Sequence, residues 1–137
     1  MTDTRALPQP TPETEHFWEG TRQGELRLQR CDDCASVYFP PRPFCPECSS
    51  RQVSVFRASG RGTLASYVIN ERPHPAFPGP YAIAIVALEE GPKMMSNIVD
   101  CPQTPQALTL DMPLAVTFEK LNEEISLPLF APVGEEL

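Results

Sequence analysis

The sequence predicts a mainly β protein with a short N-terminal helix, a small cysteine-rich module and a five-stranded barrel. Three observations support this fold class. A helix-like segment comes first, two Cys-x-x-Cys pairs follow it closely, and short runs of apolar and β-branched residues fill the second half of the chain. With 137 residues, the chain is long enough for one ordinary domain or two very small ones.

Residues 1–24 are predicted to form a proline-rich arm and then a short helix. The helix is expected over the letters PETEHFWEGTRQGEL, with Thr11 as its N-cap and the proline that follows in its first position. Gly24 is expected to end it, because glycine adopts the left-handed conformation of a helix C-terminus without strain. Its large apolar side chains, Phe17 and Trp18, either dock the helix on the rest of the protein or await a partner.

Residues 25–52 are predicted to form a small metal-binding module. A strand is expected in ELRLQRC, where leucines alternate with polar residues. This strand leads into Cys31-x-x-Cys34, and Cys45-x-x-Cys48 follows after ten further residues. Each pair can wrap one side of a metal ion in a tight knuckle, and a module of this size is too small to bury a useful core without a metal.

Four thiolates close the coordination shell of such a metal, which leaves no position for water or substrate and makes the site structural. One zinc ion is expected, and a single iron in a rubredoxin-like site is the second choice, since both metals accept four thiolates. A redox pair would have to begin a helix within a βαβ unit, and neither pair begins a helical pattern. Two disulfides are the remaining alternative, and they would require export to an oxidising compartment.

Residues 53–132 are predicted to form the barrel, and residues 133–137 an acidic tail. Five strand-like runs are separated by turn signals: VSVFRASG, TLASYVINE, YAIAIVALEE, KMMSNIVD and LAVTFEKL. The proline-dense segment ERPHPAFPGPY is expected to be a long loop, because proline cannot donate a hydrogen bond within a central strand. Five short strands with bends and one long loop fit an OB-fold barrel, and a small sandwich is the alternative.

The charge balance argues against nucleic acid as the main partner. The chain carries 18 acidic and 11 basic side chains, a formal net charge of −7, and from Pro73 onward nine acids are accompanied by only two lysines. Nucleic-acid-binding proteins usually carry a basic surplus. No apolar run reaches the ~18–20 residues that cross a bilayer, and the N-terminal letters lack the apolar core of a signal peptide. We therefore expect no membrane segment and a cytoplasmic location.

Catalytic equipment is scarce in the sequence. Cys101 is a lone cysteine, and His16 and His74 are the two histidines that could serve it as a base. A stand-alone acyl-CoA enzyme that uses Cys101 or His74 is the least favoured hypothesis, because a thiol nucleophile needs an adjacent base. The neighbouring acids Glu89 and Glu90 are expected to point to opposite faces of a strand. The sequence therefore predicts a protein that is not an enzyme on its own.

Longer stretches of the sequence resemble one known family. FWEGTRQGELRLQRC, YFPPRPFCPEC, GRGTLASY, LEEGPKMMSNIVD and PLFAP occur in the order found in the ribbon-plus-OB proteins called domain of unknown function, number thirty-five. Together they span residues 17 to about 132, nearly the whole chain. The resemblance implies a rubredoxin-like zinc ribbon followed by a five-stranded OB-fold. It also implies that the zinc ligands are Cys31, Cys34, Cys45 and Cys48.

Members of this family resemble accessory subunits more than enzymes. They partner thiolase-fold proteins, including acetyl-CoA acetyltransferases, lipid-transfer-protein-like thiolases and retro-aldolases of steroid side-chain breakdown, and some are fused to or associated with hydratases of the MaoC type. The resemblance implies a non-catalytic scaffold that binds a thiolase-like partner and helps to form its acyl-CoA site. A single-stranded nucleic-acid-binding OB module is the alternative, because zinc ribbons and OB-folds both bind nucleic acids elsewhere.

Candidates for contact with the partner or with CoA are aromatic and arginine residues of the helix and of the loop between the cysteine pairs. Such side chains are enriched at protein interfaces. They are Phe17, Trp18, Tyr38, Phe39, Arg42 and Phe44. Some of the rings are expected instead to pack the ribbon against the barrel, and Arg42 can equally be a solvated surface side chain.

The chain departs from the family pattern at four positions. Ala35 and Ser49 follow the second cysteine of each pair, where glycine is common, so the knuckle backbone is expected to differ. Asp111 stands where a glycine commonly precedes a turn. Ala131 stands where arginine is common, which leaves any anion contact there without its guanidinium. None of these changes affects a cysteine.

Overall fold

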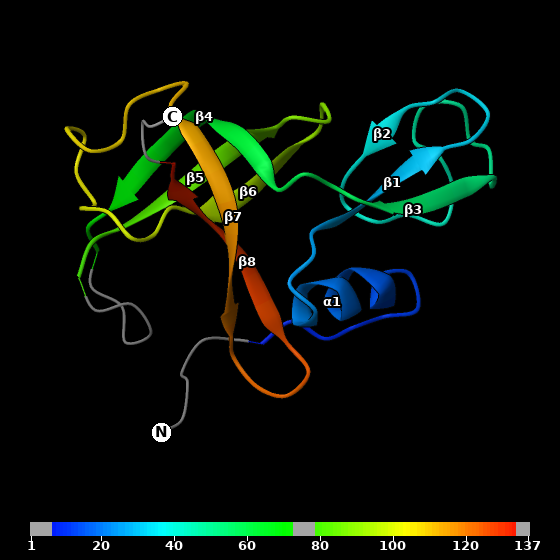
Figure 1. Ribbon diagram of the computed structural model, residues 1–137, viewed down its shortest axis with the longest axis horizontal. Helices are drawn as coiled ribbons and strands as arrows, with labels where there is room; N and C mark the ends of the chain where they lie inside the picture. Colours follow the sequence, from blue (N-terminus) through cyan, green and yellow to red (C-terminus); the bar gives the residue numbers. More distant parts are fainter. Residues whose placement is uncertain (1–6, 73–78, 134–137) are drawn as a thin grey trace.

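The structure is a computed structural model and describes residues 7–72 and 79–133. It is mainly β, with one helix among the described residues, so the predicted fold class is confirmed (Figure 1). The elements are α1 (Glu15–Arg22), β1 (Arg27–Cys31), β2 (Val37–Tyr38), β3 (Val53–Arg57), β4 (Arg61–Asn70), β5 (Tyr81–Leu88), β6 (Lys93–Asn97), β7 (Pro113–Lys120) and β8 (Ser126–Pro132). A three-stranded sheet, β2-β1-β3, lies at one end of the molecule, and a five-stranded sheet, β6-β5-β4-β7-β8, lies at the other.

The helix α1 begins at Glu15 rather than directly after Thr11. Thr11 and Thr14 form a turn in which the Thr14 amide donates to the Thr11 carbonyl (3.0 Å) and the Thr11 amide donates to the Thr14 hydroxyl (2.9 Å). The expected cap at Thr11 is therefore wrong. Thr14 occupies the N-cap position. Its hydroxyl accepts a hydrogen bond from the Thr11 amide in the preceding turn and does not cap the amides of the helix.

The helix ends as predicted, at a left-handed glycine. Gly24 has φ +78°, its amide donates to the Thr21 carbonyl (3.1 Å), and the Glu25 amide donates to the Gly20 carbonyl (2.8 Å). These two bonds form a Schellman motif, which satisfies helix carbonyls that would otherwise lack donors. The motif turns the chain into β1, so α1 packs beside that strand.

The strand β3, which the sequence predicts as the first strand of the barrel, lies instead in the three-stranded sheet. It pairs antiparallel with β1 along its whole length, from Arg27 opposite Arg57 to Cys31 opposite Val53. Gly60, at φ +80°, then redirects the chain before β4 begins. The ribbon sheet therefore combines β1, which leads into the first cysteine pair, β2, which lies between the pairs, and β3, which follows the second pair.

The five-stranded sheet closes on itself as a barrel. Its end strands β6 and β8 meet in parallel at Ile98 and Phe130, where the Val99 amide donates to the Phe130 carbonyl (2.8 Å). The order around the barrel is β4-β5-β6-β8-β7 and back to β4, consistent with an OB-fold. The predicted number of barrel strands is confirmed, but β8 takes the place of β3. The prolines at positions 128 and 132 obscured β8 in the sequence. They are tolerated because β8 forms a continuous ladder only with β7, whereas its other side meets β6 at the single bridge between Ile98 and Phe130.

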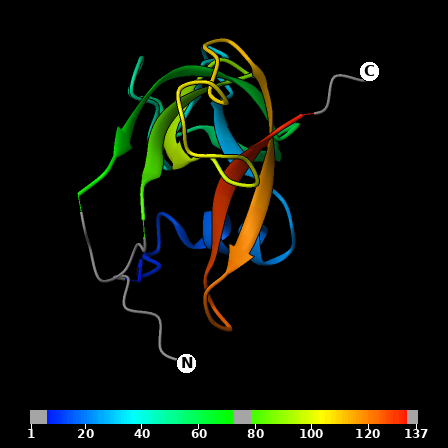
Figure 2. The ribbon, with the colours of Figure 1, turned by 90° about the vertical axis from the view of Figure 1, so that its left-hand side faces the viewer.

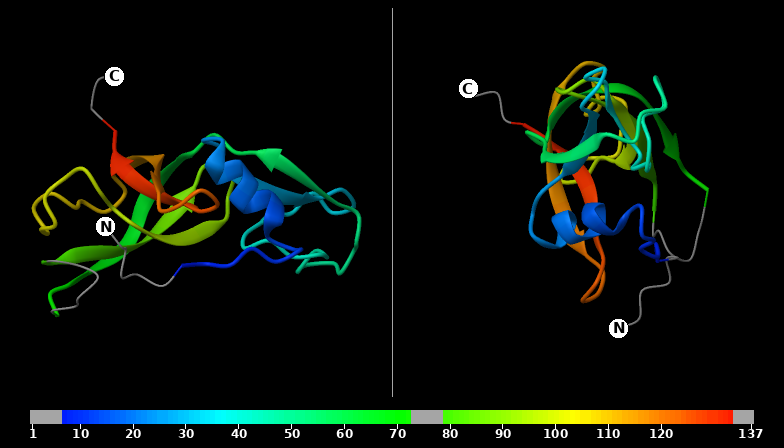
Figure 3. Two further views of the ribbon diagram at one scale, coloured as in Figure 1. Left: turned by 90° about the horizontal axis from the view of Figure 1, so that it is seen from below. Right: turned by 90° about the vertical axis from the view of Figure 1, so that its right-hand side faces the viewer.

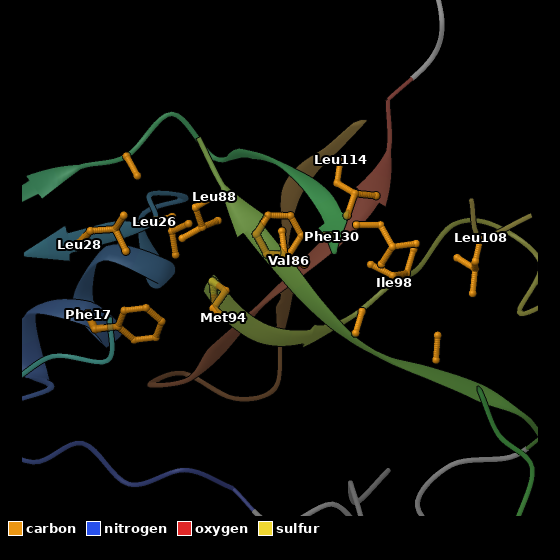
Figure 4. Close-up of a cluster of buried hydrophobic side chains, with 14 residues drawn as sticks. Phe17, Leu26, Leu28, Val86, Leu88, Met94, Ile98, Leu108, Leu114 and Phe130 are labelled. Atoms are coloured by element: carbon orange, nitrogen blue, oxygen red, sulfur yellow. The ribbon is translucent and has the colours of Figure 1, made fainter. Parts of the chain in front are cut away.

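One hydrophobic core joins the barrel to the helix and the ribbon (Figure 4). In the barrel it contains alternate side chains of β5, such as Val86 and Leu88, and Phe130 of β8. Phe17 of α1 and Leu28 of β1 belong to the same buried cluster. The ribbon is therefore fixed on the barrel by shared core packing. Within the described part of the chain, no helix is long and apolar enough to cross a membrane.

Candidate functional site

The two Cys-x-x-Cys pairs form equivalent turns. In each, the amide of the residue after the second cysteine donates to the carbonyl of the first: Ala35 to Cys31 and Ser49 to Cys45, both at 2.9 Å. In the first turn the Cys34 amide also donates to the Cys31 sulfur (3.4 Å). One turn follows β1 and the other precedes β3, so the pairing of these two strands brings the turns together.

The four sulfur atoms lie close enough to share one metal ion. All four Sγ atoms are within 4.8 Å of one another, and the Cys31–Cys48 and Cys34–Cys45 Sγ distances are both 3.6 Å. A tetrahedral metal with sulfur at about 2.3 Å needs sulfur atoms about 3.8 Å apart, so the cluster fits such an ion with small shifts. Cys31 and Cys45 are buried, whereas Cys34 and Cys48 are exposed. A metal held by all four sulfurs has no open position for substrate or water.

Acidic and hydroxyl side chains brace the two turns. The Ser54 hydroxyl donates to the Asp32 carboxylate, with oxygen–oxygen distances of 2.7 and 2.8 Å, and the Ser50 hydroxyl donates to Asp33 Oδ2. The Asp32 amide donates to the Gln52 carbonyl (2.8 Å). These bonds tie the first turn to the segment that leaves the second, so each turn positions the other.

Hydrogen bonds separate the acidities of the two exposed thiols. The side chain and then the backbone of Ser36 lower the pKa of Cys34 to about 6. At Cys48 the backbone of Ser50 lowers the pKa. The hydrogen bond with Cys31, desolvation and the other neighbouring thiols outweigh this effect and raise the pKa of Cys48 to about 12. Four thiolates side by side therefore require a compensating cation, and a metal ion supplies that charge.

Three of the departures from the family pattern fall on left-handed backbone. Ala35 and Ser49 both have φ +67°, and Asp111 has φ +68°. Glycine adopts this region freely, whereas another L-residue there costs roughly 1–2 kcal/mol. Both turns take up the glycine-type conformation despite their side chains, so the expected change of backbone geometry is replaced by local strain.

The predicted contact residues fall into an inner group and an outer group. Phe17 and Tyr38 are 4% and 7% exposed, so their rings lie in the interior of the chain. Trp18 and Phe39 are half-buried and pack on Phe17, with ring centroids 4.9 and 5.3 Å from it. Phe17 thus packs the helix against the ribbon and the barrel. This agrees with the expectation that some of the candidate rings have a packing role.

Arg42 and Phe44 lie on the surface, in the loop between the two cysteine pairs. The Arg42 amide donates to Gln29 Oε1 (2.6 Å), and its carbonyl accepts a hydrogen bond from the Tyr38 hydroxyl (3.4 Å). Phe44 is 40% exposed. The backbone of the loop is therefore held by the ribbon sheet, while both side chains are presented to the outside.

A groove with apolar walls, called the aromatic groove below, lies between the rings of Trp18 and Phe39 and the barrel. The sequence did not predict it. It encloses about 260 Å³, and its walls include Trp18, Phe39, Met95 of β6, and Leu127 and Pro128 of β8. Figure 3 shows α1 between the ribbon and the β8 end of the barrel. Because four separate segments build this groove, no local pattern in the sequence could reveal it.

The other candidate residues do not converge on a catalytic centre in residues 7–72 and 79–133. Burial, and after it the Asp100 carboxylate, raises the pKa of Cys101, which is unfavourable for a nucleophilic thiol. Glu90 Oε2 accepts a hydrogen bond from the Ser59 amide (2.7 Å). This acid therefore binds the segment that connects β3 of the ribbon to β4 of the barrel. His74 lies outside the described residues.

A ribbon with four clustered cysteines, joined through a common core to a five-stranded OB-type barrel, defines the class of protein. The family description "ChsH2, rubredoxin-like zinc ribbon domain" matches residues 18–54, and "ChsH2, C-terminal OB-fold domain" matches residues 57–119. A "DUF35 domain-containing scaffold protein" of Methanothermobacter thermautotrophicus is 35% identical over 116 residues, which cover 82% of this chain and 86% of the relative. The chain belongs to the DUF35 family, as its sequence resemblance predicts.

Two further relatives bear on function. A "Probable enoyl-CoA hydratase alpha subunit" of Thermomonospora curvata is 36% identical over 85% of this chain, which spans only 36% of the length of that relative. A chain of the solved structure "Ltp2-ChsH2(DUF35) aldolase" is 33% identical, with a TM-score of 0.81 and coverage of 92% of this chain and 98% of the other. A DUF35 protein of Sulfolobus solfataricus, 13% identical with a TM-score of 0.64, shares the fold.

Proposed function

We propose that this chain is a non-catalytic accessory subunit that binds a thiolase-like enzyme and helps to form the acyl-CoA site of that enzyme. The likeness to a chain of the "Ltp2-ChsH2(DUF35) aldolase" structure, over nearly the full length of both, is the observation that carries the proposal. Relatives named scaffold protein or hydratase alpha subunit support a role as a subunit. The partner class comprises acetyl-CoA acetyltransferases, lipid-transfer-protein-like thiolases and retro-aldolases, and we place the complex in the cytoplasm.

One structural zinc ion, held by Cys31, Cys34, Cys45 and Cys48, is part of the proposal. The sulfur cluster has the donor set and the size for zinc, and the closed shell suits a structural rather than a reactive metal. When bound, the ion cross-links the two ends of the loop between the cysteine pairs, residues 35–44, which is called the knuckle loop below. The four cysteines thereby hold that loop in the position from which its side chains reach the partner.

The proposed partner surface consists of the exposed side chains of the knuckle loop and the adjoining groove. Arg42 and Phe44 form its outer part, and Trp18 and Phe39 line its inner part. A guanidinium binds carboxylates and phosphates through two parallel hydrogen bonds, so Arg42 suits either a partner carboxylate or a CoA phosphate. Phe17 supports the inner rings from the core.

Co-expression with a thiolase-like protein from the same organism, chosen for a gene adjacent to that of this chain, tests this proposal. We expect a complex that survives gel filtration and that Phe44→Glu weakens. Leu110→Glu replaces another exposed apolar side chain, 56% exposed, and should leave the complex intact. If the two proteins purify separately and the partner is fully active alone, the proposal fails. Binding of a labelled single-stranded oligonucleotide with a steep salt dependence would favour the nucleic-acid alternative instead.

A further inference from the structure

The outer face of the barrel carries an apolar strip that no element in the described residues covers. The buried positions of β5 alternate with Ile83 and Ile85, which therefore point outward. Val68 of β4 lies opposite Ile83, and Met95 of β6 lies opposite Ile85. Val68 is 60% and Met95 66% exposed, the two highest values among the large apolar side chains of the described residues. These four residues are called the outer strip below.

The strand β4 also has an open backbone edge beside the outer strip. It pairs with β5 over residues 62–70 but with β7 only over residues 61–63. Figure 2 shows the far half of β4 at the margin of the molecule, with β5 on one side only. Leu64 still bonds to the backbone of Asp111 and Met112, and beyond Leu64 no strand of the described residues continues the sheet on that side.

Backbone geometry identifies the groups that face this open edge. The Ala82 amide and carbonyl bond to side chains on the β6 side of the sheet, so the next residue, Ile83, directs its backbone to β4 and pairs there with Val68. By the same alternation, Tyr67 and Ile69 direct their amides and carbonyls away from β5. A partner strand could therefore form backbone hydrogen bonds with these two residues.

The edge has little protection against added strands. Its letters SYVIN, residues 66–70, contain neither a charge nor a proline, although proteins commonly place such residues on open edges. A bulge, which is another common protection of an edge, lies before this stretch between Leu64 and Ser66, and residues 66–70 themselves pair regularly with β5. The strands β4, β5 and β6 carry Arg61 and Lys93 but no acid, in a chain whose net charge is −7. Glu71 and Glu89 follow directly on β4 and β5, so the acids lie at the strand ends, and the middle of this face suits a neutral or acidic protein surface.

We propose that the outer strip and the open edge of β4 form a second docking surface for the thiolase-like partner, which adds an extended segment to β4 and packs apolar side chains on the strip. This inference rests on the proposed function. Met95 lines both the strip and the aromatic groove, so the new surface is continuous with the proposed partner surface. A second copy of this chain would bring the same cations, Arg61 and Lys93, whereas acidic side chains of a different protein complement them.

The test measures the affinity of the full zinc-loaded chain for the co-purified thiolase-like protein. Val68→Glu and Met95→Glu each place a carboxylate on the strip and should weaken binding at least about tenfold, as expected when a buried interface residue is disrupted. Leu110→Glu, the matched change outside the strip, should leave the affinity unchanged. In wild-type protein, hydrogen exchange of the Tyr67 and Ile69 amides should slow when the complex forms.

Each result decides the inference. Wild-type affinity in both strip variants, or no slowing of exchange at Tyr67 and Ile69, overturns the second docking surface while the proposed function stands. Absence of any wild-type complex overturns both. If light scattering shows a wild-type dimer that Val68→Glu converts to monomers, the strip binds a second copy and the inference is likewise wrong. The exchange measurement needs no variant, so a variant that misfolds does not prevent the test.

Discussion

Replacement of Ala35 by glycine should strengthen both the fold and the binding of the metal. Ala35 follows the first cysteine pair with φ +67°, where a side chain costs roughly 1–2 kcal/mol. Glycine removes this cost but loses about 0.5–1 kcal/mol through the greater freedom of the unfolded chain. The net gain is about 0.75 kcal/mol at the middle of both ranges, within limits of about 0–1.5 kcal/mol. Because metal binding and folding of a small ribbon are coupled, the apparent zinc dissociation constant should fall about two- to fivefold.

Competition with a chromogenic zinc chelator measures this change, and urea unfolding at fixed free zinc measures the stability. Ser49→Gly, at the equivalent position with φ +67°, should behave in the same way. Ala115→Gly lies in the strand β7 and is the control: it should destabilise the protein by about 0.5–1 kcal/mol without a specific effect on zinc affinity. The reasoning is refuted if Ala35→Gly weakens zinc binding or destabilises the protein as Ala115→Gly does.

Three other changes test separate parts of the structure. Cys45→Ser removes a buried thiol and should abolish the roughly one zinc per chain that elemental analysis is expected to find in the wild type; a well-folded native protein without metal would contradict this. Gly60→Ala should lower the free energy of unfolding in urea by about 2–4 kcal/mol, because φ is +80° and the added Cβ would lie 2.6 Å from Val116 Cγ1. The control Gly24→Ala, at φ +78° with open space around it, should lower it by only about 1 kcal/mol. Equal losses in the two variants would refute the clash with Val116. Burial, and after it the Arg27 guanidinium, lowers the pKa of His16 from 6.5, so the unfolded chain takes up the proton first and stability falls as the pH drops below that value. His16→Gln should therefore lose less stability than the wild type between about pH 7.5 and pH 5.5. Parallel plots of unfolding free energy against pH would show that His16 does not contribute.

Local sequence features proved sufficient where the structure depends on a few neighbouring residues. The spacing of the cysteines predicts a compact cluster, and the structure brings all four sulfurs within 4.8 Å. Gly24 predicts the end of the helix because its left-handed conformation is a local property. The glycine positions of the family pattern also predict where the turns are left-handed, although Ala35 and Ser49 occupy them here.

Features that depend on distant residues were beyond the sequence analysis. The strand β3 looks like any barrel strand, and only its pairing with β1 places it in the ribbon. The strand β8 contains two prolines and is held by β7 and by the contact between Ile98 and Phe130. Phe17 and Tyr38 are aromatic residues of the kind enriched at interfaces, yet shared packing of helix, ribbon and barrel buries both. The aromatic groove depends on the same packing.

The activity of the thiolase-like partner, with and without this chain, tests the central claim most directly. Steady-state kinetics with an acyl-CoA substrate should show that kcat/KM rises at least about tenfold when the zinc-loaded chain is added, since a completed acyl-CoA site stabilises the transition state by about 1.4 kcal/mol or more. The zinc-free Cys45→Ser variant should produce no such rise. A partner that is fully active alone, and unchanged by the addition of this chain, would contradict the account.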